Sequence, residues 1–336
     1  MSIRVLIIDD SPFYRTILKK GIEQNKDIEV VAVASDAYDA SQKIIEYRPH
    51  IITCDIEMPK IDGVSLIKQL LPQYPIPIIV VSSVGDKIFD AIKAGAIDYL
   101  LKANFSDSSE RILFFKELTS KIISAYNKTY IQKAEKFNYV RIKAKKNITH
   151  SIIAIGASTG GTQAISSILQ QLPKEIPPIV IVQHIPPVFS TLFAARLNQD
   201  FPYVVKEAER GEPLLNNHVY ISPGDKHVEV RMGVNNKPFL ITSKGEKVNG
   251  HCPSVDKLFF SVAKVFKAKA VGILLTGMGT DGALGLSAIR RAGSVTLTQD
   301  EKTCVVYGMP LAAKELGASQ HEVPINLMGA TIMKYL

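Results

Sequence analysis

Short apolar runs alternate with amphipathic stretches of helical length along most of the chain. In the first half, five runs are short, rich in Val and Ile, and typical of buried strands: Ile3–Ile8, Glu29–Val33, Ile51–Cys54, Ile76–Val81 and Ala96–Leu101. Between them, apolar residues recur at helical spacing, and Ser11 followed by Pro12 predicts the start of the first helix. Strict alternation of strand and helix predicts a parallel sheet covered by helices on both faces.

The alternation resumes at Ser151, with a second set of predicted buried strands over Ile152–Ile155, Ile179–Val182, Val271–Leu275 and Ser294–Thr298. A hairpin is predicted from His227 to Ser243, around Val234-Asn235-Asn236. The sequence thus predicts two α/β domains, the second with a mostly parallel sheet and an antiparallel hairpin. The expected limits are 1–120 and 150–336, with a basic, helical linker over 121–149.

Length and composition agree with a globular protein of two domains. The chain has 336 residues, of which 46% are hydrophobic and 21% are charged. No apolar run reaches the roughly 18 residues that a membrane helix needs, and the first residues lack the basic head of a secretory signal. The three cysteines are far apart in the sequence. We therefore expect a cytoplasmic protein without membrane insertion.

The net charge of +8 is concentrated in one segment. Between Lys116 and Asn147 there are nine Lys and Arg against two Glu, which leaves the rest of the chain nearly neutral. Such a segment is more typical of a solvated connector than of a nucleic-acid-binding face, so no nucleic-acid partner is expected.

Polar residues follow successive strands of the first half. Asp9 and Asp10 follow the first strand, Asp55 the third, Ser82 lies at the end of the fourth, and Lys102 follows the fifth. Ligands bind beyond the carboxyl ends of such strands. Three crowded carboxylates need a cation, and oxygen ligands suit Mg²⁺. With an ammonium and a hydroxyl nearby, this pattern predicts a site for an aspartyl-phosphate on Asp55.

Residues 1 to about 120 resemble a two-component receiver domain of the flavodoxin-like (βα)5 fold. The resemblance rests on Val5–Ser11, Asp55–Gly63, Ser82 and Lys102. It implies that Asp55 is phosphorylated by a histidine kinase, with Ser82, Lys102 and Tyr99 as switch residues. The implied Mg²⁺ ligands are Asp9, Asp10, Asp55 and the backbone carbonyl of Glu57. One departure is Ala103, where the family usually has proline; it puts the geometry of the loop after Lys102 in question.

Three strand ends of the second half carry the residues needed for acyl transfer. Ser158 follows the first strand, His184 the second and Asp281 lies in the turn after the third. A serine needs a base, a histidine titrates near neutrality, and a carboxylate fixes its tautomer. We expect these three to be nucleophile, general base and orienting acid, with backbone N–H groups near Thr159 and Met278 facing the oxyanion.

Other interpretations of this half remain open on the residues alone. Gly156–Gly160 matches G-x-S-x-G, but the order Ser, His, Asp differs from that of α/β-hydrolases. A glycine-rich phosphate loop is the alternative, although the G-x-G-x-x-G spacing is missing. His251 could line the substrate pocket or have a structural role. No His/Cys/Asp cluster has metal-ligand spacing, so no cofactor is expected for this half.

The second half resembles the catalytic domain of CheB-type protein-glutamate methylesterases. The matching stretches are Ile155–Gly161, Gln183–Pro187, Tyr220–Asp225, Pro253–Asp256, Leu275–Gly282, Gln299–Glu301 and Tyr307–Pro310. The resemblance implies hydrolysis of glutamate γ-methyl esters, and deamidation of glutamines, on chemoreceptor cytoplasmic domains. It implies the Ser158–His184–Asp281 triad and a receiver that blocks the site until Asp55 is phosphorylated. Cys252 stands where the family commonly has arginine.

The sequence fits two further classes of function less well. A receiver-controlled transcription factor would carry a short, basic output domain, whereas this output is long and nearly neutral. A receptor-docking protein with an inactive hydrolase stays an alternative, and the presence of all three triad residues argues against it.

Overall fold

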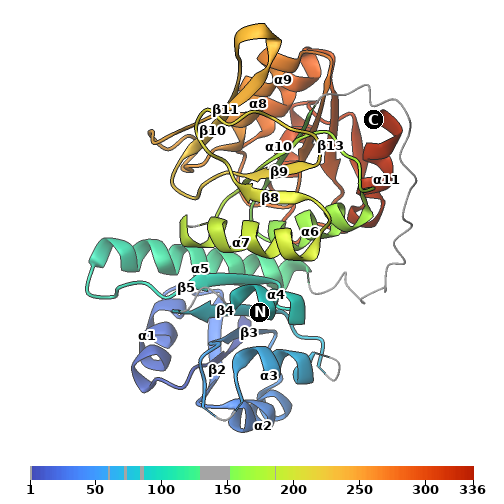
Figure 1. Ribbon diagram of the computed structural model, residues 1–336. Coiled ribbons are helices and arrows are strands. Elements are labelled where there is room, and N and C mark those ends of the chain that lie inside the picture. The colour runs from blue at the N-terminus through green and yellow to red at the C-terminus, as the bar shows by residue number, and fades with distance from the viewer. Residues whose placement is uncertain (1, 60, 72–73, 84–86, 129–151, 186) are drawn as a thin grey trace. The chain divides into compact units, whose positions relative to one another are not determined.

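The computed structural model describes residues 2–59, 61–71, 74–83, 87–128, 152–185 and 187–336. The chain divides into two compact units, Met1–Lys133 and Ala134–Leu336 (Figure 1). The boundary expected at residue 120 lies inside a helix that continues to Lys128. Most of the basic segment after it, residues 129–149, lies outside the described residues, so the domain limits and the linker stay a prediction.

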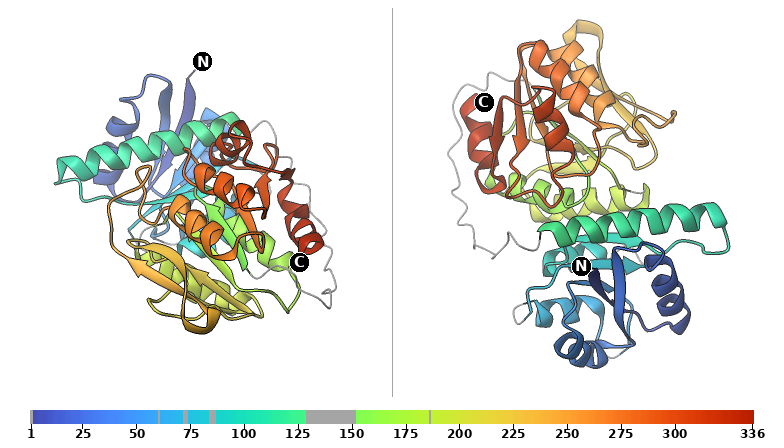
Figure 2. Two further views of the ribbon diagram at one scale, coloured as in Figure 1. Left: turned by 90° about the horizontal axis from the view of Figure 1, so that it is seen from above. Right: turned by 180° about the vertical axis from the view of Figure 1, so that it is seen from behind.

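The first unit contains one five-stranded parallel sheet in the order β2-β1-β3-β4-β5. Its strands are β1 (Ile3–Ile8), β2 (Ile28–Ala34), β3 (Ile51–Cys54), β4 (Ile78–Ser82) and β5 (Asp98–Leu101). Its helices are α1 (Pro12–Ile22), α2 (Ala37–Tyr47), α3 (Gly63–Leu70), α4 (Ile88–Ala94) and α5 (Ser108–Lys128). Helix α1 contacts α5 on one face, and α3 contacts α2 and α4 on the other (Figures 1 and 2).

The first helix begins as the sequence predicts. The Ser11 hydroxyl accepts a hydrogen bond from the Tyr14 N–H at 3.5 Å, and Pro12 occupies the first helical position. The buried face of α1 presents Leu18 and Ile22 to the core that it shares with α5 and the sheet. The Ser11 cap therefore sets where this helix starts. The spacing of its apolar residues sets which face is buried.

The second unit contains a seven-stranded parallel sheet in the order β14-β13-β12-β6-β7-β9-β8. Its strands are β6 (Ile152–Ala157), β7 (Ile179–Gln183), β8 (Val204–Glu207), β9 (His218–Ile221), β12 (Ala270–Leu274), β13 (Val295–Gln299) and β14 (His321–Val323). Its helices are α6 (Gly161–Gln171), α7 (Pro187–Asp200), α8 (Val255–Phe266), α9 (Ala283–Arg291), α10 (Met309–Glu315) and α11 (Ile325–Tyr335). Helices α8 and α9 pack together, and α6 packs with α11 (Figure 2).

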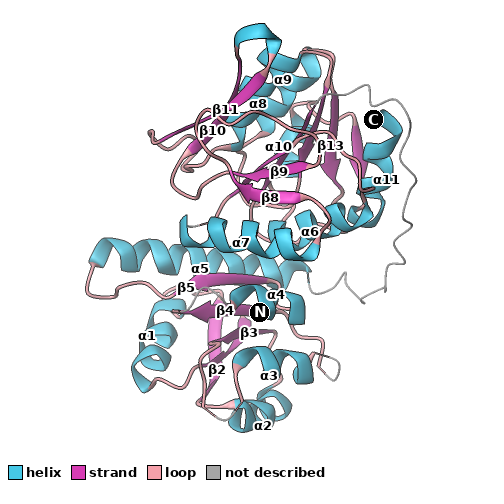
Figure 3. Cartoon of the chain, viewed as in Figure 1, coloured by secondary structure: helices cyan, strands magenta, loops and turns pink. Residues whose placement is uncertain are grey.

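A separate antiparallel pair confirms the predicted hairpin. Strands β10 (His227–Met232) and β11 (Pro238–Ser243) pair directly and are joined through a short 3₁₀ turn, Val234–Asn236 (Figure 3). The predicted fold class of both halves is thereby confirmed. Strands β8, β9 and β14 were not predicted.

The sheet order places the predicted chemistry at neighbouring strand ends. In the first unit β1 lies beside β3, and in the second β6 lies between β12 and β7. Both sheets are parallel, so the residues that follow these strands meet at one edge. None of the described helices combines the length and the apolar character required to cross a bilayer.

Candidate functional site

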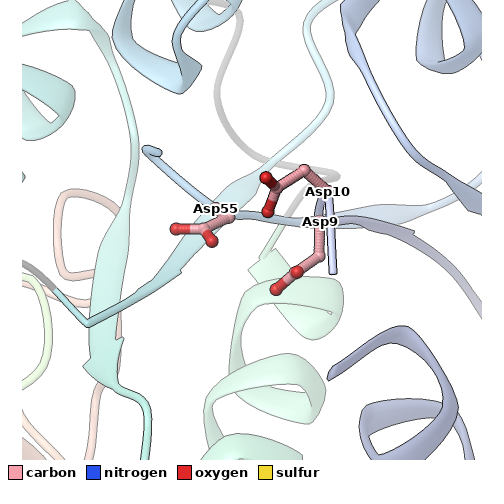
Figure 4. Close-up of side chains that lie close together, drawn as sticks. All are labelled: Asp9, Asp10 and Asp55. Atoms are coloured by element: carbon pink, nitrogen blue, oxygen red, sulfur yellow. The ribbon is translucent and has the colours of Figure 1, made fainter. Parts of the chain in front are cut away.

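Three carboxylates meet at the carboxyl edge of the first sheet. Asp9 and Asp10 follow β1, Asp55 follows β3, and one oxygen from each lies within 4.8 Å of the others (Figure 4). Asp9 and Asp55 are buried, whereas Asp10 is exposed. Their backbone neighbours fix them: the Ser11 N–H donates to Asp9 Oδ1 at 2.9 Å, and the Ile56 N–H donates to Asp55 Oδ1 at 2.6 Å. The cluster predicted from the strand ends is thus assembled in the fold.

Lys102 enters the same cluster from the end of β5. Its Nζ lies 2.7 Å from Asp9 Oδ2 and 2.5 Å from Asp55 Oδ2. Burial works to lower the pKa of Lys102, but the two carboxylates outweigh it and raise the pKa, so the ammonium stays charged. The Tyr14 ring covers Nζ at 4.0 Å and itself packs on Phe105. Despite the alanine at position 103, Lys102 therefore points into the cluster.

The donor set is suited to a magnesium ion. Three carboxylates and one ammonium leave two negative charges, which a divalent cation would neutralise. Burial, with Asp55 close by, raises the pKa of Asp9 against the opposing effect of Lys102. Hard carboxylate oxygens, one of them open to water at Asp10, are the ligands that Mg²⁺ prefers. Asp9, Asp10 and Asp55 would therefore hold the ion.

The remaining predicted receiver residues lie around this cluster. Ser82 is fully buried at the end of β4, where its carbonyl accepts the Lys102 N–H at 3.0 Å. The Glu57 side chain is exposed, and its N–H donates to Asp55 Oδ1 at 3.3 Å. Tyr99 is buried in β5 beside Phe89. The roles of these three residues as switch and metal-binding groups stay a prediction.

Gly63 packs directly against the backbone of Asp55 and Ile56. A Cβ atom at this position would lie 2.1 Å from the Asp55 carbonyl oxygen and 2.9 Å from the Ile56 Cα, and both are backbone atoms. We expect Gly63→Ala to destabilise the first unit by about 1–3 kcal/mol and to reduce phosphorylation of Asp55. Thermal unfolding and phosphate incorporation from acetyl phosphate would measure both effects. Wild-type values for both would contradict this steric argument.

In the second unit, Ser158 lies between the ends of two neighbouring strands. On one side, Ala157 and Gln183 are paired in the ladder, and the His184 N–H donates to the Ala157 carbonyl at 3.0 Å. On the other side, the Ser158 N–H donates to the Thr276 carbonyl at 3.0 Å. The Gln183 amide also donates to the Ser158 carbonyl at 2.8 Å. The turn that carries the half-buried Ser158 side chain is therefore held from both sides.

His184 and Asp281 are in direct contact. Nε2 of His184 lies 2.9 Å from Oδ2 of Asp281, and the two side chains are 7% and 0% exposed. The other ring nitrogen, Nδ1, is buried and has no hydrogen-bond partner among the described residues. With the Nε2 proton donated to the carboxylate, Nδ1 carries the free lone pair. In this arrangement Nδ1 is the ring nitrogen that can accept a proton.

Asp281 is bound at the N-terminus of α8. Its two oxygens accept the Val255 N–H at 2.7 Å, the Asp256 N–H at 3.2 Å and the Ser254 hydroxyl at 2.8 Å. Burial alone would raise the pKa of Asp281, but His184, the Val255 N–H and the Ser254 hydroxyl lower it to about 2. The carboxylate is consequently ionised at every pH near neutrality.

The two turns predicted to bind an oxyanion are linked. The Thr276 hydroxyl donates to the Thr159 carbonyl at 2.9 Å, and Gly277 follows Thr276 directly. A Cβ atom on Gly277 would lie 2.7 Å from the Ser158 Cβ, so only glycine lets the two turns approach this closely. Thr159 and Met278 thus belong to turns that border Ser158. Their N–H groups as oxyanion donors stay a prediction.

Sequence reasoning missed the residues that hold Asp281. Ser254 caps α8, since its hydroxyl accepts the Lys257 N–H at 3.5 Å, and the same hydroxyl donates to Asp281. A serine before the apolar pattern of α8 is a recognisable capping signal. That signal locates the helix start but says nothing about a carboxylate 27 positions away.

Comparisons with known proteins cover both units. Residues 153–332 match the CheB methylesterase family model, and residues 5–112 match the response regulator receiver domain model. A protein-glutamate methylesterase/protein-glutamine glutaminase of Syntrophomonas wolfei is 42% identical over 334 residues, covering 99% of this chain and 98% of that protein. A relative of the same description from Shewanella oneidensis is 40% identical, covering 100% of this chain and 98% of its own length.

A solved structure resembles the second unit. The CheB methylesterase catalytic domain of Thermotoga maritima aligns with 36% sequence identity and a TM-score of 0.54. The alignment covers 56% of this chain and 100% of that structure. The likeness therefore spans a complete catalytic domain.

Proposed function

Because the chain belongs to the CheB methylesterase family and carries a response regulator receiver domain, we propose that Ser158, His184 and Asp281 act as a catalytic triad. The substrates are glutamate γ-methyl esters on the cytoplasmic domains of chemoreceptors, with glutamine side chains as a second substrate. The chain is accordingly a carboxylic-ester hydrolase that also deamidates.

The first half of the reaction forms an acyl-enzyme. Ser158 Oγ attacks the γ-carbonyl carbon while Nδ1 of His184 takes the hydroxyl proton. The proton on Nε2 stays between His184 and Asp281, whose charge stabilises the imidazolium. When the tetrahedral intermediate collapses, His184 returns its new proton to the leaving group. Methanol leaves from an ester, and ammonia leaves from a glutamine.

The second half uses water in place of Ser158. His184 Nδ1 takes a proton from a water molecule that attacks the acyl carbon, and then gives this proton to Ser158 Oγ. The product is a glutamate carboxylate for both substrates. In each half, the Thr159 and Met278 N–H groups would stabilise negative charge on the carbonyl oxygen.

One observation carries the assignment. The buried 2.9 Å contact between His184 Nε2 and Asp281 Oδ2 leaves Nδ1 as the only ring nitrogen able to accept a proton. A histidine that is oriented by a buried carboxylate and follows the strand next to Ser158 has the requirements of a general base. A mere docking module has no need of this arrangement.

The receiver would control this activity through Asp55. A histidine kinase supplies the phosphoryl group: its phosphohistidine P–N bond breaks and a P–O bond to Asp55 forms. Mg²⁺, when bound by Asp9, Asp10 and Asp55, offsets charge on the transferred group. Lys102, 2.5 Å from Asp55, would neutralise a further phosphoryl oxygen.

Regulation is tested with the full chain and methylated receptor signalling domains. We expect acetyl phosphate with Mg²⁺ to increase methanol release at least about fivefold, and chelation of Mg²⁺ to remove this increase. Asp55→Asn should keep the basal rate but show no stimulation. Stimulation of Asp55→Asn equal to wild type would contradict the assignment of Asp55. No methanol from wild type under either condition would contradict the esterase proposal for this substrate.

A further inference from the structure

A tight turn outside the seven-stranded sheet reaches the triad. Val248 and His251 are paired through the Val248 N–H to the His251 carbonyl at 3.0 Å and the His251 N–H to the Val248 carbonyl at 2.9 Å. Between them, Asn249 and Gly250 have φ angles of 52° and 84°. Positive φ at both central residues is typical of a type I′ turn, which an Asn-Gly pair favours. The backbone of this turn, Val248–His251, is therefore narrowly defined.

The Asn249 side chain joins two buried carboxylates. Its Nδ2 donates to Asp256 Oδ2 at 2.8 Å and to Asp281 Oδ1 at 3.2 Å. A primary amide has two N–H bonds, so each carboxylate receives one of them. Burial and the neighbouring Asp281 raise the pKa of Asp256, which reflects the repulsion between the two acids. The amide offsets this repulsion at the oxygen of Asp281 that does not face His184.

His251, at the other end of the turn, stacks on His184. The ring centroids are 3.8 Å apart and the planes differ by 6°. Burial, followed by the proximity of His184, lowers the pKa of His251 to about 4, so the ring is neutral near pH 7. A flat, neutral surface at van der Waals distance resists tilting of the His184 ring without adding charge beside it.

We infer that the Val248–His251 turn is a positioning element for the triad, with Asn249 holding the Asp281 carboxylate and His251 holding the His184 ring. The inference deepens the proposed function and rests on the triad assigned there. Both residues act through another side chain, so they are positioning residues. One turn thereby restrains the acid and the base together.

The amide is tested by removing it without changing the backbone. Asn249→Gly keeps a residue that tolerates positive φ. We expect kcat for methanol release, and the rate at which a fluorophosphonate labels Ser158, to fall about tenfold with KM unchanged. Asn236→Gly, at an exposed position of φ 57° in the β10–β11 turn, is the matched control and should behave as wild type. Wild-type kcat and labelling in Asn249→Gly, or a change in KM alone, would overturn the role of Asn249.

The stacking of His251 on His184 is tested with one variant that keeps an aromatic ring at position 251 and one that removes it. His251→Phe retains a flat surface and should stay within about twofold of wild type, whereas His251→Ala should lose about tenfold in kcat and in labelling. Equal losses in the two variants would refute stacking as the role of His251. An alanine variant with wild-type kcat and labelling would refute it as well.

The backbone geometry of the turn is tested with a matched pair of glycine substitutions. Gly250 and Gly211 both have φ of 84°, and no atom lies within 4 Å of a Cβ added at either position. Alanine should therefore strain both backbones alike and lower the thermal midpoint similarly, but only Gly250→Ala should lower kcat and labelling. Equal losses of activity in both would show a general effect of strain and overturn the inference.

The two readouts separate failure of this inference from failure of the proposed function. If wild type is labelled at Ser158 but releases no methanol, the proposed substrate is wrong, and labelling still reports on the turn. If Ser158 is not labelled in wild type, the triad and the inference both fail.

Discussion

Replacing Ser158 with alanine is expected to reduce methanol release by about 10⁴-fold or more, leaving only the residual rate that substrate binding and oxyanion stabilisation support. The Ser158 hydroxyl is the proposed nucleophile, and alanine leaves no group at this position that could form the acyl-enzyme. The measurement is methanol release from methylated receptor signalling domains, with and without acetyl phosphate and Mg²⁺. Labelling by a fluorophosphonate should disappear in the same variant.

A matched serine distinguishes chemistry from folding. Ser166 lies on the helix that follows Ser158, where its hydroxyl donates to the Thr162 carbonyl at 2.9 Å. Ser166→Ala should therefore retain wild-type methanol release and labelling. A Ser158→Ala protein that keeps a tenth or more of the wild-type rate would rule out Ser158 as the nucleophile.

Replacing Asp281 with asparagine should lower kcat by about 10⁴-fold with little change in the shape of the side chain. The groups around Asp281 all donate hydrogen bonds. They are Nε2 of His184, the hydroxyl of Ser254, the Asn249 amide and the N–H groups of α8. An asparagine must direct its own N–H₂ group at some of these donors. If that group faces His184, the proton moves to Nδ1, and the base can no longer accept a proton from Ser158. If it faces away, the imidazolium loses its counter-charge.

A second substitution tests whether the loss of kcat is specific to Asp281. Asp300 follows the adjacent strand β13 and accepts the Thr303 N–H at 3.2 Å, so Asp300→Asn is the corresponding change outside the triad. We expect it to preserve kcat. Asp281→Asn will also be less stable, because the low pKa of Asp281 means that its charge stabilises the fold above about pH 4, a contribution lost as the pH falls towards 2. Activity is therefore compared well below both thermal midpoints, and a near-normal kcat in Asp281→Asn would exclude it as the orienting acid.

The sequence predicted the elements that are long, apolar and periodic. Strands β1 and β3 begin and end at the predicted residues, and the hairpin around Val234 forms as expected. Two of the three missed strands are short and little buried: β14 has three residues and β8 has four, each with only one buried. Such segments carry too little apolar pattern, and the neighbouring strand rather than local propensity makes them extended.

The sequence likewise predicts some features of the candidate sites and not others. The ends of parallel strands meet at one edge of a sheet, so the sequence alone groups Asp9, Asp55 and Lys102. The direction of the His184 ring could not, because it depends on Asp281, 97 positions away. The Asn249-Gly250 pair is a visible turn signal, yet the partners of Asn249 follow only from how α8 and the β12–α9 turn pack. Long-range side-chain geometry is what sequence patterns omit.

The sheet order has a consequence for how the enzyme fails on heating. Strands β12, β6 and β7 are interior strands, and β14 and β8 form the two edges of the sheet. Edge elements open first in local fluctuations, whereas central strands exchange their amide protons only through wide opening. Deuterium uptake should therefore reach β8 and β14 long before the strands that carry Ser158 and His184. Loss of activity should coincide with cooperative melting of the sheet centre, which makes turnover a probe of global rather than local unfolding.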